Sequence, residues 1–396
     1  MNLSAIIHRS STAYIYPSAR DTLELRLITA RDDVKQIELL YWQRYENNPE
    51  KIKRKLLDFS LRDALHDYYR VTIRTEKIAA YVRYCFHLKS DDAEVWLGSK
   101  GIQHKSPAMN ENFFEFLWPN AADGFWLSPW HEQQIYYQIF PERFKRNDGV
   151  SAPQALAPWG TLPSRDNFMG GNLPGILNKL DYIHRLGATC IYLTPIFCAP
   201  SNHKYDTTDY FDIDPGFGTK EDLRQLVKEV HRRDMRIILD GVFNHCGYYW
   251  SKFQDVVQKG AVSEYKDWFF IHGYPVTADN MNYDCVGHYK WMPKINLSNP
   301  EAKKYFISVG KYWMKEFKID GWRLDVADEV PTSFLEAFSA AMREENADCI
   351  LLGETWGNAE RLVMGNRLDS AMNYLFRDAL FRGWQSRTCQ LRSLMR

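Results

Sequence analysis

The sequence has no excess of charge of either sign. Its 50 lysines and arginines balance 50 aspartates and glutamates, so the formal net charge at pH 7 is zero. No basic run stands out, which removes the usual reason to expect a nucleic acid or an anionic membrane as a partner. The sequence also has no run of 18 apolar residues, and residues 1–9 hold no apolar stretch of signal-peptide length. We therefore predict a cytoplasmic protein that binds neither nucleic acid nor membrane.

Cysteine motifs are missing as well. The seven cysteines are an odd number, and no two of them form a Cys-x-x-Cys pair. Several lie in apolar runs, which favours buried free thiols over disulfides or a zinc site. Aromatic residues, in contrast, make up 15% of the chain. Their flat faces suit stacking on sugar rings and equally suit an aromatic-rich core, so composition alone leaves both interpretations open.

Acidic residues stand at the ends of several predicted strands. Residues 321–324 form a short strand pattern that leads into Asp325, and a second apolar run leads into Glu354, 29 positions later. A third run, residues 236–240, ends in Asp240. In an α/β barrel the carboxyl ends of the parallel strands form the active-site face. We therefore expect these carboxylates to meet in one cleft.

Strand and helix patterns alternate over the second part of the chain. The helical patterns at 220–233 and 300–318 are long enough for crossover connections between parallel strands. Six runs are predicted to be strands of one sheet, at 135–140, 189–194, 236–240, 319–324, 349–353 and 370–374. This alternation predicts a (β/α)8-type barrel of which about six strands are present.

Several segments resemble the signature regions of a known enzyme family. Residues 240–245, 321–327 and 353–354 look like three ordered regions of the α-amylase superfamily, glycoside hydrolase family 13. Three further segments resemble its neopullulanase, cyclomaltodextrinase and maltogenic amylase branch, namely 137–144, 203–210 and 292–296. The resemblance implies a retaining hydrolase that acts on α-1,4-glucosidic bonds of cyclomaltodextrins, pullulan or short maltodextrins.

The resemblance assigns the catalytic roles to two carboxylates. It implies that Asp325 is the nucleophile and Glu354 the general acid/base of a double displacement. Arg323 lies two residues before Asp325 on the same strand face, so we expect it to keep Asp325 charged and to lower its pKa. Glu354, nearer apolar and acidic neighbours, is expected to keep its proton. A purely structural ion pair between Arg323 and Asp325 is the alternative.

The resemblance also implies a set of substrate-binding residues. They are Asp240, Asn244, His245, Arg323, His203, Tyr205, Trp356 and Tyr374. Among them, Asp240 is expected to bond Arg323, Tyr205 to be a stacking platform and Trp356 to lie on the leaving-group side. The alternatives are a core histidine at His245 and packing against the loop layer for Trp356 and Tyr374.

Calcium is the only cofactor that the resemblance suggests. Relatives often bind it just after the first barrel strand, where this chain carries Asn147, Asp148, Gly170 and Asn172. Two cationic residues adjoin these positions, and Asn172 stands where relatives usually carry aspartate, which weakens an oxygen-rich site. We therefore predict no required cofactor and keep calcium as the alternative.

The pattern of apolar and polar residues predicts that the chain consists of a β-sandwich followed by a barrel. Short alternating runs at 22–28, 69–75 and 79–87 predict an N-terminal antiparallel β-sandwich, which resembles the carbohydrate-binding-like module that precedes the barrel in this branch. We expect the boundary in residues 119–124. The predicted domains are the sandwich at 1–125, the first part of the barrel at 126–246, an inserted B domain after the third strand at 247–298, and the second part of the barrel at 299–396.

Six strands do not close a barrel that needs eight. The family's fourth signature region, which supplies a histidine and a third essential aspartate, follows the sixth strand in relatives. We therefore expect the native protein to continue past Arg396, and the 396 residues alone to aggregate or unfold in part and to lack glucan hydrolysis. An inactive glucan-binding fragment and a transglycosylase with the same residues are the alternative functions. The resemblance further implies a homodimer formed through the N-terminal module, with an α-glucan oligosaccharide as substrate.

Overall fold

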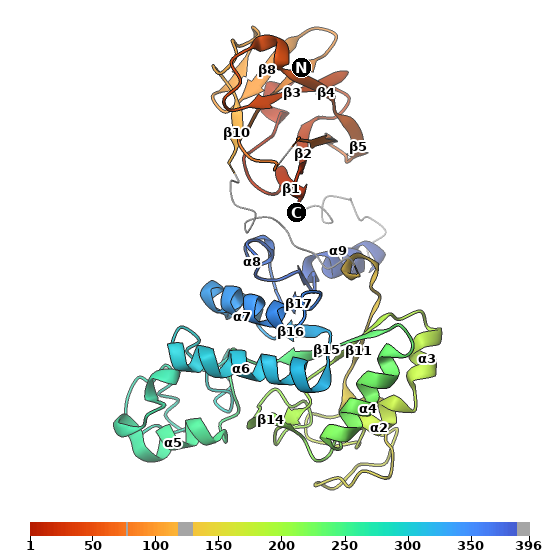
Figure 1. Cartoon of the computed structure of the whole chain (residues 1–396), viewed down its shortest axis with the longest axis vertical. Coiled ribbons are helices and arrows are strands. Elements are labelled where there is room, and N and C mark those ends of the chain that lie inside the picture. The colour runs from red at the N-terminus through yellow and green to blue at the C-terminus, as the bar shows by residue number, and fades with distance from the viewer. Residues whose placement is uncertain (77, 118–129, 386–396) are drawn as a thin grey trace. The chain divides into compact units, whose positions relative to one another are not determined.

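The computed structural model of the chain describes residues 1–76, 78–117 and 130–385 (Figure 1). The chain divides into two compact units. One consists of residues 126–363 and 367–373, and the other groups residues 1–125 with 364–366 and 374–396. The domain boundary predicted at 119–124 lies outside the described residues, so it stays a prediction.

The N-terminal residues form two antiparallel sheets. In the first sheet the order is β1 (Ile15–Ala19), β2 (Thr22–Ala30), β6 (His66–Arg74) and β5 (Asp58–Arg62). In the second it is β4 (Lys53–Leu56), β3 (Gln36–Gln43), β7 (Val82–Lys89), β8 (Glu94–Gly98) and β9 (Gly101–Gln103), with β10 (Phe114–Phe116) also paired to β7.

Alternation of side chains explains why these sheets pack together. Leu23, Leu25 and Leu27 on β2 and Tyr84 and Phe86 on β7 are fully buried in one apolar cluster. Alternate residues of a strand point to one face, so each sheet contributes one apolar face to this shared core. The prediction of an N-terminal β-sandwich is confirmed.

The second unit is built on a sheet of six parallel strands in sequence order. They are β11 (Tyr136–Ile139), β12 (Cys190–Leu193), β15 (Arg236–Gly241), β16 (Gly321–Leu324), β17 (Ile350–Gly353) and β18 (Ser370–Ala371). Each pairs with the next in parallel register, which is the arrangement of a curled, partial (β/α)8 barrel. All six predicted strands are present. The last is shorter than predicted, because Tyr374 already begins helix α9 (Tyr374–Gln385).

Two of the helices were predicted, and their caps are in the sequence. Thr219 and Asp222 form a capping box at the start of α4 (Lys220–His231), and Asn299 caps α6 (Pro300–Phe317), which has proline at its first position. The remaining helices are α1 (Pro141–Phe144), α2 (Leu173–Leu177), α3 (Leu180–Arg185), α5 (Ser251–Lys259), α7 (Thr332–Glu345) and α8 (Glu360–Val363).

The two faces of the parallel sheet have different surroundings. Side chains such as Leu193, Leu239 and Trp322 belong to a large apolar core that also contains the buried faces of α4, α6 and α7. The alternate positions of the same strands form a small separate cluster of Cys190, Tyr192, Ile238, Ile350 and Leu352. The next residues along this second face, at the carboxyl ends of the strands, are the predicted acids.

Two irregular segments follow strands of this sheet. Residues 199–208 lie between β13 (Phe197–Cys198) and β14 (Asp209–Ile213), a short antiparallel ribbon. Residues 247–298 contain α5, two 3-10 turns, η5 (Gly260–Val262) and η6 (Lys266–Trp268), and isolated bridges such as Phe269 to Ile295. The regular pattern resumes at α6, as predicted, and the B-domain boundaries stay a prediction.

The cysteine and membrane expectations concern the described residues only. Six cysteines are free thiols, and Cys85, Cys190, Cys246 and Cys349 among them are buried. Cys389 lies outside the described residues. In the part of the chain that the structure describes, no helix combines the length and the apolar character needed to cross a membrane.

Candidate active site

Strand register brings the predicted acids and Arg323 to one end of the sheet. Asp240 on β15 is the direct register partner of Arg323 on β16, and Arg323 is the partner of Leu352 on β17. Asp325 follows β16 at once, and Glu354 follows β17. Because alternate residues share a face, these four side chains point to the same side of the sheet.

Arg323 lies at the centre of this cluster. Its Nη1 donates to Oδ1 and Oδ2 of Asp240 at 2.9 and 3.0 Å and to Oδ1 of Asp325 at 2.7 Å. Its Nη2 lies 2.8 Å from Oε2 of Glu354. All four residues are buried. The structure therefore brings the three predicted carboxylates together, and the expected bond between Asp240 and Arg323 is present.

The carboxylates of Asp325 and Glu354 are close enough for a two-carboxylate reaction. They contact neighbouring nitrogens of one guanidinium, at 2.7 and 2.8 Å. Only two short contacts and the width of one guanidinium can separate them, which keeps the pair within the limit of roughly 9.5 Å for glycosidases.

The pKa of Asp325 is shifted in the opposite direction to the one predicted. Burial and the negative charge of Asp240 raise the pKa of Asp325 well above its usual range, and Arg323 opposes them only in part. Arg323 lowers the pKa of Asp325, as predicted, but the expectation that this pKa lies below its usual range is wrong. The physical reason is that one guanidinium is shared among three acids in a site that excludes water.

Two tyrosines complete the environment of Asp240. The hydroxyls of Tyr192 and Tyr205 both donate to its Oδ2, the latter at 3.1 Å. Burial raises the pKa of Asp240, while Arg323 and these hydroxyls oppose the rise. Tyr192 was not predicted. Its position in the strand at 189–194, on the face shared with Asp240, was the available signal.

His245 is buried beside Asp325 with its ring unpaired. Its Nε2 lies 3.9 Å from Oδ2 of Asp325, and neither ring nitrogen has a hydrogen-bond partner among the described residues. Burial lowers the pKa of His245 to about 4, so the ring is neutral at pH 7. A buried imidazole with unused polar atoms can donate to or accept from a hydroxyl of a bound ligand.

Val326 holds a strained backbone next to Asp325. Its φ of 46° and ψ of 47° lie in the left-handed region, which a β-branched residue rarely adopts. This conformation directs the Val326 N–H to Oε2 of Glu354 at 3.2 Å. No sequence pattern predicted the strain, and it links the turn after β16 to the carboxylate after β17.

Residues 203–205 reach the site from the segment between β13 and β14. Nδ1 of His203 accepts from the Tyr205 N–H at 3.1 Å and lies 3.2 Å from the hydroxyl of Ser201. Between them, Lys204 is buried, with its Nζ 2.7 Å from Asp214. Through these contacts the segment places the Tyr205 hydroxyl on Asp240.

Asn244 and the segment 292–296 are connected. The amide of Asn244 donates to Oε2 of Glu329 at 3.3 Å, and Nζ of Lys294 lies 2.6 Å from the same oxygen. The backbone of Ile295 donates to the Asn244 carbonyl at 2.9 Å. The segment 292–296 therefore contacts the residues after β15 through Ile295, and it contacts Glu329, which follows β16, through Lys294. Of the two groups that bond Glu329, only Asn244 was expected to bind substrate.

Trp356 and Tyr374 are two further aromatic residues that were predicted to bind substrate. The side chain of Trp356 is 64% exposed, and its backbone N–H donates to Asp328 at 2.6 Å. Tyr374 is not at a strand end as predicted but begins α9, where the guanidinium of Arg377 lies over its ring.

The candidate calcium ligands lie around the start of α2. Within the described residues, no three side chains of His, Cys, Asp or Glu are placed to share a metal ion. Nδ2 of Asn172 donates to the carbonyls of both Asn147 and Gly170. The carbonyl oxygens that a cation would use are thus already occupied by an amide.

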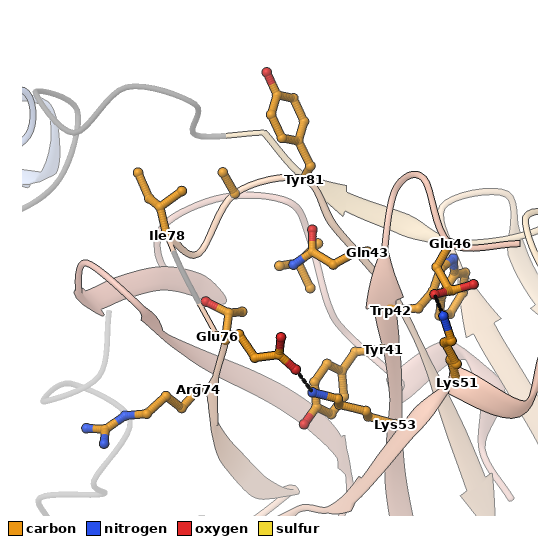
Figure 2. Close-up of a pocket in the computed structure, with 13 residues that line it drawn as sticks. Tyr41, Trp42, Gln43, Glu46, Lys51, Lys53, Arg74, Glu76, Ile78 and Tyr81 are labelled. Carbon is orange, nitrogen blue, oxygen red and sulfur yellow. Dashed lines mark hydrogen bonds and ion pairs between the residues drawn. The ribbon is translucent and has the colours of Figure 1, made fainter. Parts of the chain in front are cut away.

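The N-terminal β-sandwich holds a separate cavity of about 610 Å³ (Figure 2). Tyr41 and Trp42 of β3 line it together with Tyr81, and ion pairs at its edge join Lys51 to Glu46 and Lys53 to Glu76. None of the predicted site residues lines this cavity.

Comparison with known proteins identifies relatives over most of the chain. Residues 1–120 match the family model of the alpha amylase N-terminal ig-like domain, and residues 138–396 match that of the alpha amylase catalytic domain. A cyclomaltodextrinase of Geobacillus thermopakistaniensis is 42% identical over 96% of this chain, and an intracellular maltogenic amylase of Bacillus subtilis is 40% identical over 98%. The chain spans 66% of the length of each of these relatives. The solved structure of a cyclomaltodextrinase, 36% identical, superposes with a TM-score of 0.88 over 96% of this chain and 66% of that one.

Proposed function

This chain belongs to the α-amylase family of glycoside hydrolases, and on that basis we propose that it carries the catalytic centre of a retaining α-glucan hydrolase. The proposed substrates are cyclomaltodextrins, pullulan and short maltodextrins, cleaved at α-1,4-glucosidic bonds. The observation that carries the proposal is the contact of one guanidinium, that of Arg323, with Asp240, Asp325 and Glu354 at the ends of three adjacent strands.

The first half of the proposed reaction forms a covalent sugar ester. The carboxyl group of Glu354 donates its proton to the glycosidic oxygen while the bond from that oxygen to the anomeric carbon breaks. A carboxylate oxygen of Asp325 bonds to the anomeric carbon from the opposite face. Arg323 holds Oδ1 of Asp325, which leaves Oδ2 for the attack.

The second half returns both groups to their starting states. Glu354, now a carboxylate, takes a proton from water as the water oxygen bonds to the anomeric carbon, and Asp325 leaves. Two displacements at one carbon retain its configuration. With one cation among three buried acids, we propose that the free site keeps one proton at neutral pH, shared between Asp325 and Glu354, and that this proton lies on Glu354 when substrate is bound.

Residues around the acids are proposed to bind the sugar. The neutral, unpaired ring of His245 is suited to a sugar hydroxyl, the half-buried ring of Tyr205 to stacking, and the exposed Trp356 to the leaving-group side. Asp240, held by Arg323 and two tyrosines, fixes the position of the guanidinium.

The configuration of the first product tests the proposal. The product of the complete reading frame that encodes these residues is mixed with a cyclomaltodextrin, and the anomeric protons are followed by NMR. Retention predicts that the α-anomer forms first. A β-anomer formed first, or no reducing ends at all, would contradict the proposal. Longer oligosaccharides among the products would identify transfer in place of hydrolysis.

A cytoplasmic location and a homodimer formed through the N-terminal module complete the proposal. The relative from Bacillus subtilis is named an intracellular enzyme, which supports the location. Analytical ultracentrifugation of the chain with and without residues 1–117 tests the dimer. A loss of dimer on removal of these residues is expected, and a monomer in both samples would refute it.

A further inference from the structure

The segments for which the family resemblance suggests calcium are in direct contact. Residues 145–149 follow α1, and residues 170–172 precede α2. The Asn172 N–H donates to the Lys145 carbonyl at 3.1 Å, and the Gly171 N–H donates to the Glu142 carbonyl at 2.9 Å. A Cβ atom on Gly171 would lie 2.1 Å from the Pro141 carbonyl oxygen. Only glycine permits this backbone approach.

The side chain of Asn172 makes four hydrogen bonds, two of which join it to Asn147 in the other segment. Its Nδ2 donates to the carbonyls of Asn147 at 2.9 Å and Gly170 at 3.3 Å. Its Oδ1 accepts from the N–H groups of Asn147 at 3.2 Å and Gly175 at 2.9 Å. Carbonyls can only accept and these N–H groups can only donate, so the orientation of the amide is fixed by its partners.

The other oxygen atoms of the candidate set are engaged elsewhere. Oδ1 of Asn147 accepts from the Gly149 N–H at 2.9 Å within its own turn. The side chain of Asp148 is 89% exposed and lies 3.0 Å from the guanidinium of Arg146. A hard cation needs several oxygen ligands that point at one position, and here an N–H group of Asn172 points at that position instead.

We propose that the buried amide of Asn172 cross-links these two segments in place of a cation. Its Nδ2 donates to the two carbonyl oxygens, and its Oδ1 accepts from the first turn of α2 and so caps that helix. Because the amide is neutral, no charge has to be compensated. Calcium therefore neither binds nor stabilises this part of the chain.

Replacing the side-chain NH2 group of Asn172 with a carboxylate oxygen tests the proposal. In the Asn172→Asp variant the cap acceptor is retained, but a carboxylate oxygen faces the two carbonyl oxygens without a proton between them. In EDTA this variant is expected to melt about 5 °C or more below the parent, because two buried hydrogen bonds are lost and a charge is buried. Calcium, by bridging carboxylate and carbonyls, is expected to recover at least half of that shift.

Asn299→Asp is the matched control. Asn299 also caps a helix, and both hydrogen bonds that the structure describes for its side chain are accepted ones, from Glu301 and Ala302. Aspartate accepts equally well there, so neither a loss of stability nor a response to calcium is expected.

The parent chain gives an outcome that requires no variant. Its melting temperature should be the same in EDTA and in millimolar calcium, and calorimetric titration should detect no calcium binding. A calcium-dependent rise in the parent would overturn the proposal. So would an Asn172→Asp variant that equals the parent in EDTA, or one that is destabilised and does not respond to calcium. If this variant is recovered only from calcium-containing buffer, loss of its fold on addition of EDTA counts as the expected result.

Discussion

At the scale of single residues, the ratio of acids to Arg323 sets the chemistry of the site. One guanidinium contacts three carboxyl groups, all of them buried. Ionising all three would leave two negative charges uncompensated in a medium of low dielectric constant, which is costly. The acids therefore ionise in steps that belong to the cluster, as an acid and a nucleophile in one site require.

The Asp325→Asn substitution is expected to affect the rate of catalysis and not the affinity for substrate. Asp325→Asn, made in the product of the complete reading frame, is expected to lower kcat for a maltodextrin on the order of 10⁴-fold or more. Substrate affinity should change little, because the nucleophile bonds to the sugar only during the reaction. Steady-state kinetics and calorimetric binding measure the two effects. Asp348→Asn, at an exposed position, is the control. Activity near that of the parent would exclude Asp325 as nucleophile.

Replacement of His245 alters the dependence of stability on pH. Its folded-state pKa of about 4 lies below the usual 6.5, so the unfolded chain takes up the proton first. The contribution of the neutral His245 ring to the free energy of unfolding is complete above pH 6.5. It falls by about 2–4 kcal/mol as the pH is lowered from 6.5 to 4. His245→Gln should therefore show a shallower loss in urea titrations over this range. His288→Gln, at an exposed position, is the control for removal of a histidine. Equal slopes in both variants would contradict the assignment.

The sequence was sufficient to predict where the three acids lie but not to predict their pKa values. Asp240, Asp325 and Glu354 stand at strand ends, and the parity of a strand fixes which face each side chain occupies. The pKa of Asp325 depends on burial and on how many acids share Arg323, and these are known only after folding. Tyr192 and the left-handed Val326 escaped prediction for a related reason. Their roles follow from contacts with Asp240 and Glu354, which are distant in sequence.

At the scale of elements, the pairing of β16 with β17 depends on Gly321. A Cβ atom at this position would lie 2.0 Å from the Ile350 carbonyl oxygen, a backbone atom that cannot turn away. Gly321→Ala must therefore separate two strands that carry Arg323 and lead to Glu354. We expect a loss of about 2 kcal/mol or more in the free energy of unfolding. Gly357→Ala is the control, because a Cβ atom there meets nothing within 4 Å. A Gly321→Ala variant with the same free energy of unfolding as the parent would contradict this account.

Only some of the elements with a repeating pattern were predicted. Helix α7, whose buried residues Phe334, Leu335, Phe338 and Met342 recur at helical spacing, was not. All six parallel strands and the helices α4 and α6 follow from apolar runs and caps. The ribbon of β13 and β14 has only two and five residues, too few to show a period. It nevertheless supports the segment that carries His203 and Tyr205. The start of α9 at Tyr374 shortened the last predicted strand, because an aromatic residue fits either element.

At the scale of the whole molecule, the two compact units have separate apolar cores. Calorimetry of the chain is therefore expected to show two unfolding transitions, since two-state behaviour holds for single cores. Gly321→Ala should lower the temperature of only one of them. A single transition that shifts as a whole would show that the units unfold together.

A ligand that carries its own positive charge suits the three acids around Arg323 better than a neutral sugar does. Asp240, Asp325 and Glu354 outnumber Arg323, so a protonated ring nitrogen in place of the anomeric carbon can compensate the negative charge that the shared proton compensates in the free site. Such a compound would drive out the shared proton on binding. The heat of binding should then vary with the ionisation enthalpy of the buffer, and basic sugar mimics should be preferred as inhibitors over uncharged ones.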